Sequence, residues 1–107
     1  MLSVAFVGKK QIAELNKRYL RRRGPTDVIS FAFRAEGIGA GLIGDIYICP
    51  QVARENARRQ GVALREEMLR LVVHGVLHAI GHDHPEGEGR MESPMWKKQE
   101  RIVARIA

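Results

Sequence analysis

Alternation of apolar and polar positions predicts three strands in the first half of the chain. The clearest is Asp27 to Phe33 (DVISFAF), where successive side chains would point to opposite faces of an extended segment. β-branched and aromatic residues make Leu2 to Val7 another strand and Leu42 to Cys49 a third. The glycine-rich stretch AEGIGAG is expected to connect the strand Asp27 to Phe33 with the strand Leu42 to Cys49.

Helical periodicity predicts four helices. They are expected to span Lys10–Leu20, Pro50–Gln60, Leu64–Ile80 and Met95–Ile106. The third is amphipathic at its start and apolar nearly all round in its second half (LVVHGVLHAI), which is typical of a helix that enters the middle of a domain. This order of elements predicts a single α+β domain over residues 1–107, in which a small mixed sheet packs against helices.

Composition agrees with one soluble domain. The 107 residues are 45% hydrophobic, which is enough for one modest core. No run of about eighteen apolar residues occurs, and MLSVAFVGKKQ lacks the pattern of a signal peptide, so we expect a cytoplasmic protein without a membrane segment. The single cysteine, Cys49, excludes an internal disulfide and is expected to be a small buried apolar residue.

Charge suggests a polyanionic partner. The formal net charge is +6, and basic proteins gain affinity for nucleic acids by displacing counterions from phosphates. Much of the excess precedes Gly24 and has Glu14 as its only acidic neighbour. The basic residues there are Lys9, Lys10, Lys17, Arg18, Arg21, Arg22 and Arg23. They predict a basic patch, with an ordinary solvated loop as the alternative for the three consecutive arginines.

All four histidines lie in LVVHGVLHAIGHDHP. His74 and His78 are four residues apart, so on a helix their Cβ atoms would lie about 5–6 Å apart on one face. Gly81 can adopt a positive φ, end the helix and let His84 turn back toward that face. Three neutral histidines with an open fourth position are a usual way to hold catalytic zinc. We therefore predict one Zn²⁺ per chain on His74, His78 and His84, the alternative being ordinary core and surface histidines.

Two further residues lie between the predicted ligands. Asp83 is expected either to accept the second N–H of a ligating histidine and orient its ring, or only to support the turn. His82 is expected at the rim, outside the ligand set.

The histidine spacing resembles the H-x-x-x-H-x-x-G-x-x-H part of the metzincin protease motif. Those proteases need a glutamate directly after the first histidine as general base, and this chain has Gly75 there. Glu66 and Glu67 lie two turns earlier on the predicted helix, too far to replace it. Peptide hydrolysis by that route is therefore disfavoured.

HGVLHAIGHDH also resembles the HG-x-LH-x-x-G-x-DH signature of the YbeY-type endoribonucleases. Every specified position matches, namely His74, Gly75, Leu77, His78, Gly81, Asp83 and His84. PTDVISFAF, LIGDIYIC and LNKRY are similar to other segments of that family and occur in the family's order, so the resemblance covers most of the chain from Leu2 onward.

The resemblance implies a zinc-dependent hydrolase that cuts single-stranded RNA, in ribosomal RNA 3′-end maturation and ribosome quality control, with ribosome-associated proteins as further partners. The family has an arginine directly after the tyrosine of LN-x-x-Y, where this chain has Leu20. We expect Arg21 to take the phosphate-contacting role, with Arg22, Arg23 and Ser30 also lining the RNA site. The bound zinc would supply the nucleophilic water or the Lewis acidity.

Family members usually carry a strand and a helix ahead of the region that begins here at Leu2. Without them we expect a smaller core, an exposed sheet edge or self-association, and the oligomeric state stays open.

Two alternatives come from other classes. One is a metal-dependent hydrolase of peptides or another substrate, and the other is a non-catalytic RNA-binding or ribosome-binding module with structural zinc. Cys49 or His82 as a fourth ligand would favour the second, because structural zinc sites are usually closed. Phe31, Phe33 and Trp96 could offer stacking faces to bases, although core packing is the default expectation for all three.

Overall fold

Three strands and four helices make up the part of the chain that the computed structural model describes, residues 1–34, 41–81 and 93–106. In chain order they are β1 (Leu2–Phe6), α1 (Lys9–Leu20), β2 (Val28–Arg34), β3 (Leu42–Ile48), α2 (Pro50–Gln60), α3 (Leu64–Ala79) and α4 (Pro94–Ile106). Each end lies within one residue of its predicted position. The local pattern of apolar residues and helix-breaking glycines therefore set the elements.

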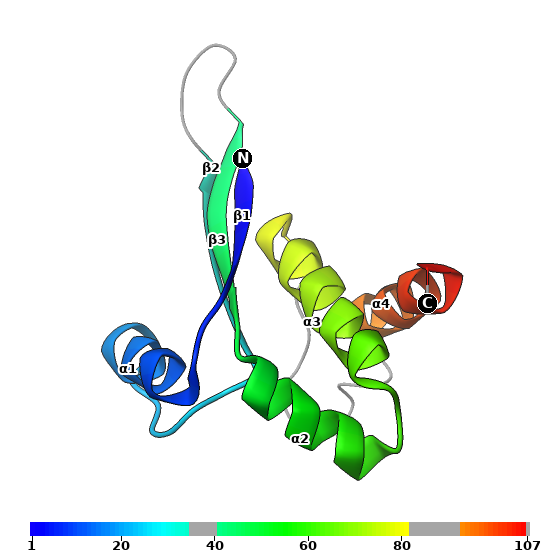
Figure 1. Cartoon of the computed structure of the whole chain (residues 1–107). Coiled ribbons are helices and arrows are strands. Elements are labelled where there is room, and N and C mark those ends of the chain that lie inside the picture. The colour runs from blue at the N-terminus through cyan, green and yellow to red at the C-terminus, as the bar shows by residue number, and fades with distance from the viewer. Residues whose placement is uncertain (35–40, 82–92, 107) are drawn as a thin grey trace.

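The sheet is mixed, as predicted, with strand order β1-β3-β2 (Figure 1). β1 runs parallel to β3 and β2 runs antiparallel to it. Alternate residues of β3 are buried, and Ile46 and Ile48 are fully enclosed while Ile43 is exposed. Because side chains alternate across a strand, the two faces of the sheet can be covered by different helices.

α3 and α1 lie on opposite sides of the sheet (Figure 1). On the α3 side, Leu71 packs in one apolar cluster with Ile46 and Ile48. On the α1 side, Ile12 packs with Ile29 and Cys49. Cys49 is completely buried, which confirms the prediction that it is a small core residue. The α+β arrangement with an apolar helix on the sheet is also confirmed.

Gly75 lets α3 approach the sheet closely. A Cβ atom at this position would lie 2.6 Å from Ile46 Cγ2, closer than any real Cβ contact. The Gly75 carbonyl also accepts a hydrogen bond of 3.2 Å from Ser30 Oγ on β2. The glycine that separates this chain from the metzincin pattern therefore has a packing role, and it fixes the distance of His74 from the sheet.

α4 packs against α3 on the side away from the sheet. Val73 and Leu77 of α3 form a buried cluster with Met95 and Val103 of α4. This contact brings residues about 25 positions apart in the sequence into one interface, and it builds one wall of the site described below.

The expectation of core packing for three aromatic residues is wrong for Phe33, whose side chain is 64% exposed. Phe33 is opposite Ile43 in the β2–β3 pairing, on the sheet face away from α3 and near the end of both strands. Phe31 and Trp96 are half-buried. β1 forms an edge of the sheet in the described part of the chain, and it exposes Val4 and Phe6.

In the segments that the structure describes, no helix combines the length and the apolar character needed to cross a bilayer.

Candidate functional site

His74 and His78 lie side by side on α3, as their spacing predicted. Their ring centroids are 5.7 Å apart and their ring planes meet at 80°. His74 is buried with 8% of its surface exposed, whereas His78 is exposed. One ring is therefore held by the protein interior and the other faces outward.

The helix ends directly after these histidines. α3 stops at Ala79, and Gly81 has a φ of 105°, which is the left-handed turn that the sequence predicted. An L-residue with a side chain rarely adopts that angle, so glycine is needed for the chain to leave the helix here. His82, Asp83 and His84, on which three sequence predictions depend, lie outside the described residues.

The described pair fits a shared zinc ion. Two imidazoles that bind one tetrahedral zinc through nitrogens at about 2.0–2.1 Å would have ring centroids about 5 Å apart, close to the separation found here. Within residues 1–34, 41–81 and 93–106, no three potential ligands gather around one point, and the third predicted ligand, His84, lies outside these ranges.

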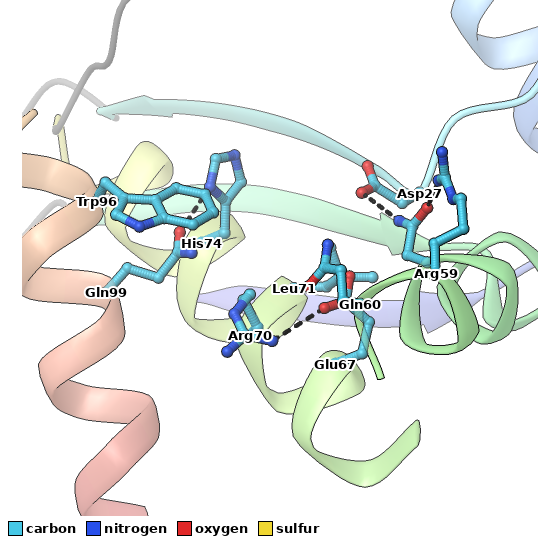
Figure 2. A pocket seen from close by; sticks show the side chains of 10 residues that line it. Asp27, Arg59, Gln60, Glu67, Arg70, Leu71, His74, Trp96 and Gln99 are labelled. Carbon is cyan, nitrogen blue, oxygen red and sulfur yellow. Dashed lines mark hydrogen bonds and ion pairs between the residues drawn. The ribbon is translucent and has the colours of Figure 1, made fainter. Parts of the chain in front are cut away.

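A cavity of about 300 Å³ opens beside His74 (Figure 2). It lies between α2, α3, α4 and the residue that precedes β2. Its lining residues are Asp27, Asn56, Arg59, Gln60, Glu67, Arg70, Leu71, His74, Trp96 and Gln99. Trp96 and His74 lie at one end of the cavity and Asp27 and Arg59 at the other, so the candidate ligand adjoins an elongated polar space.

Gln99 of α4 contacts the buried histidine. Its Oε1 lies 2.8 Å from His74 Nδ1, and the Gln99 side chain is almost fully buried (Figure 2). The sequence did not single out this residue. Its only signal is a polar residue on the apolar face of a helix that also carries Met95 and Val103.

Arg70 joins the two helices below the histidine. Its Nε and Nη2 atoms donate to the carboxylate of Glu100 on α4 at 2.9 and 2.8 Å. Its other contacts are Glu67 Oε1 at 3.0 Å and Glu66 Oε2 at 3.4 Å on its own helix. These carboxylates raise the pKa of Arg70, mainly through Glu100, so its charge is permanent and already balanced.

The pKa values of the two main carboxyl partners of Arg70, Glu67 and Glu100, are shifted in opposite directions. Burial raises the pKa of Glu67, and the Arg70 hydrogen bond offsets this only in part. Burial would also raise the pKa of Glu100, but the hydrogen bonds from Arg70 and Gln99 outweigh it and hold that pKa below its ordinary value. Glu67 serves as a partner of Arg70, which agrees with its exclusion as a general base.

Arg59 supplies positive charge at the far end of the cavity. It donates a hydrogen bond to Asn56 Oδ1, and Asn56 Nδ2 in turn donates to Asp27 Oδ2 at 3.1 Å. Arg59 is exposed, and a single carboxylate stands behind its amide partner. It was missed at the sequence level, because an arginine near the end of an amphipathic helix has no distinguishing pattern.

The predicted arginine loop lies elsewhere. Arg21, Arg22 and Arg23 are exposed at the end of α1, and none of them is among the described residues that line the cavity. Arg21 adopts a left-handed conformation with φ 55°, and Asn16 Nδ2 holds the loop by a 3.0 Å hydrogen bond to Gly24 O. Ser30, also expected at the RNA site, lies at the boundary of α3 and the sheet, where its hydroxyl donates to Gly75 O.

Two observations bear on the alternatives. Cys49 packs with Ile12 and Ile29 under α1, on the opposite side of the sheet from α3, so it is not placed to close a zinc site at His74. The position after His74 has no room for a side chain, which excludes the metzincin glutamate there.

Comparison with known proteins gives a consistent result. A family model described as endoribonuclease YbeY matches residues 1–107. The chain is 39% identical over 114 residues to the endoribonuclease YbeY of Frankia alni, covering 96% of this chain and 61% of that protein. It is 37% identical over 106 residues to that of Aquifex aeolicus, covering 99% of this chain and 70% of the relative.

A solved structure agrees with the fold. The chain resembles the solution structure of TM1509 from Thermotoga maritima with a TM-score of 0.62 and 34% identity, covering 95% of this chain and 65% of that one. The chain thus spans about three fifths of the Frankia alni relative and about two thirds of the Thermotoga maritima protein.

Proposed function

The chain belongs to the endoribonuclease YbeY family, and from this premise we propose that it is a zinc-dependent endoribonuclease that cuts single-stranded RNA. The observation that carries the proposal is the pair of histidines on α3, His74 and His78, one of which lines a polar cavity. Their ring centroids are 5.7 Å apart, which is close to the separation of about 5 Å expected for two imidazoles on one zinc and supports the proposal.

His74, His78 and His84 would hold one zinc ion per chain, with Asp83 orienting a ligand. Zinc bound by three histidines supplies a water of lowered pKa and polarises a phosphoryl oxygen. The chain's own contribution is to fix the two α3 rings. Gly75 sets the distance of the helix from the sheet, and the turn at Gly81 ends the helix directly after the histidine pair.

The cavity would receive the RNA beside the metal. Arg70 cannot neutralise a phosphate, because carboxylates already surround its guanidinium. Arg59 can neutralise a phosphate, since it is exposed and lies at the end of the cavity opposite His74. Trp96 lies half-buried beside His74 and offers a face on which a base can stack.

The arginine loop would extend this contact along the RNA backbone. Arg21, Arg22 and Arg23 are exposed and lie on the α1 side of the chain, so we assign them to phosphates beyond the cavity. We also propose the finer role that the family resemblance suggests. This role is ribosomal RNA 3′-end maturation and ribosome quality control in the cytoplasm, with ribosome-associated proteins as partners.

The test compares the zinc-loaded chain with His78→Ala, and with Lys97→Ala on the exposed face of α4 as a matched surface control. Bound zinc is measured together with cleavage of a 3′-extended ribosomal RNA fragment and of an unstructured peptide. We expect about one zinc and RNA cleavage for the wild type and for Lys97→Ala, with both lost in a folded His78→Ala.

Other outcomes would overturn the proposal. Cleavage that survives in a zinc-free His78→Ala would show that the histidine pair is not the catalytic centre. Zinc binding without any cleavage would favour a structural metal, and peptide cleavage would favour the metallohydrolase alternative.

A further inference from the structure

A closed circuit of polar contacts joins α3 and α4 around His74. Arg70 holds both oxygens of Glu100, Gln99 Nε2 donates to Glu100 Oε2 at 3.1 Å, and Gln99 Oε1 meets His74 Nδ1 at 2.8 Å. Arg70 and His74 are one turn apart on α3, so the circuit leaves this helix and returns to it. Figure 2 shows its contact between Gln99 of α4 and His74 of α3. Each hydrogen bond therefore limits which atoms of the next residue can act as donor or acceptor.

The donors and acceptors of this circuit can be assigned in only one consistent way. Arg70 can only donate hydrogen bonds, and an ionised carboxylate such as Glu100 can only accept them. The low pKa of Glu100 keeps it ionised. Gln99 must therefore turn its amide nitrogen toward Glu100 and its oxygen toward His74. An amide oxygen is an acceptor, so the nitrogen that faces it, His74 Nδ1, must carry a proton.

We propose that Gln99 is a positioning residue that holds neutral His74 in the tautomer protonated at Nδ1 and thereby presents the lone pair of Nε2 for zinc. A neutral imidazole can carry its proton on either nitrogen, and only the unprotonated nitrogen can bind a metal. The zinc part rests on the proposed function above. The tautomer itself is a property of the zinc-free chain.

The contact between Gln99 and His74 is buried, which makes an unfavourable tautomer costly. Gln99 is 1% exposed and His74 is 8% exposed, so little of either side chain meets solvent even though both line the cavity. Every buried side-chain nitrogen and oxygen in the described residues has a hydrogen-bond partner. A His74 ring with the other tautomer would place a lone pair against the amide oxygen, which is costly for buried polar groups.

The experiment uses two substitutions at position 99 and one packing control. Gln99→Met keeps the length of the side chain but removes both the acceptor for His74 and the donor to Glu100. Gln99→Glu removes the donor to Glu100 but keeps an acceptor for Nδ1–H, so the two variants together separate the two contacts. Val103→Ala removes buried volume from the same α3–α4 interface without touching the circuit. Long-range ¹H–¹⁵N spectra of the histidine rings, recorded in mildly alkaline buffer without zinc, report the tautomer.

We expect the Nδ1–H tautomer of His74 in the wild type, Gln99→Glu and Val103→Ala, and a mixture in Gln99→Met. Zinc affinity, measured by competition with a chelator, should fall by about 10- to 100-fold in Gln99→Met alone, as for other groups that orient a metal-ligating histidine. Circular dichroism checks the fold. If Gln99→Met does not fold, Glu100→Gln provides the same test, because its amide no longer dictates the orientation of Gln99.

An unchanged His74 tautomer in Gln99→Met would overturn the proposal, and so would an equal loss of zinc affinity in Val103→Ala. If the wild type itself binds no zinc, the proposed metal function fails. In that case the spectra still decide whether Gln99 sets the tautomer.

Discussion

Gly75 shows how one residue can serve both packing and chemistry. It follows the first candidate ligand, and in the sequence it is a position of the YbeY motif and the place where the metzincin general base is missing. In the fold it is the point at which α3 meets Ile46 of β3 and accepts the Ser30 hydroxyl. The absence of a side chain at this position therefore controls where the histidines lie.

Gly75→Ala should destabilise the protein by about 1–3 kcal/mol, because the added Cβ overpacks a helix–sheet contact. It would lie 2.6 Å from Ile46 Cγ2, so the helix or Ile46 must move. The free energy of unfolding is measured by urea denaturation. Gly8→Ala is the control, since a Cβ at Gly8 would meet no atom within 4 Å. Equal losses in the two variants would contradict the packing role.

At the scale of elements, α3 and α4 are joined by ionised groups as well as by an apolar cluster. Glu67 and Glu100 flank the same arginine from different helices. Their pKa values move in opposite directions because Glu67 is the more deeply buried of the two and Glu100 gains more from its hydrogen bonds. The interface should therefore respond to pH through two opposing contributions.

Glu67→Gln should make stability less sensitive to rising pH. Because the pKa of Glu67 is raised in the folded state, its contribution is fully present below the ordinary value of 4.5 and is lost as the pH rises through the folded value. Removing this titration should change the slope of the unfolding free energy against pH by at most about 1.4 kcal/mol per pH unit. The change should begin near pH 4.5, the ordinary pKa of the group, and extend to higher pH.

Urea denaturation at a series of pH values gives this slope. Glu66→Gln is the control, because Glu66 contacts the same arginine from a more exposed position. Glu100, whose pKa is lowered, contributes stability above its unfolded value that is lost on acidification, and both variants retain it. Parallel curves for the wild type and Glu67→Gln would contradict the assignment.

For the whole molecule, the distribution of positive charge matters more than its sum. The chain has a formal net charge of +6, but Arg70 is neutralised by its neighbours, whereas Arg59 and the loop of Arg21 to Arg23 are exposed. Polyanion binding should therefore depend on these exposed arginines rather than on Arg70.

Replacing Arg21, Arg22 and Arg23 together by glutamine should weaken binding to single-stranded RNA and flatten its salt dependence. Each phosphate contact to a single strand contributes about 0.7 to the slope of log K against log salt, so three contacts contribute about 2. The matched control is Lys97, Arg101 and Arg105 to glutamine, three exposed residues of α4 with the same charge change. Equal slopes for the two triple variants would show that only total charge acts.

Local features of the chain were readable from the sequence. Strand alternation, helical periodicity and the glycine at the end of α3 depend on neighbours within a few residues, and all of these predictions are confirmed. The pairing of His74 with His78 follows from the same short-range helical geometry. The YbeY motif indicated the family for the same reason, since it is a short, contiguous run of residues in the sequence.

Contacts between distant segments were decided only by the tertiary structure. Gln99 reaches His74 across 25 positions, and Arg59 joins the cavity only because α2 packs beside α3. The burial of Glu67 and the exposure of Phe33 also depend on which faces the helices cover. Periodicity determines which side of an element is apolar, but the partner of each polar group is determined by how the elements pack.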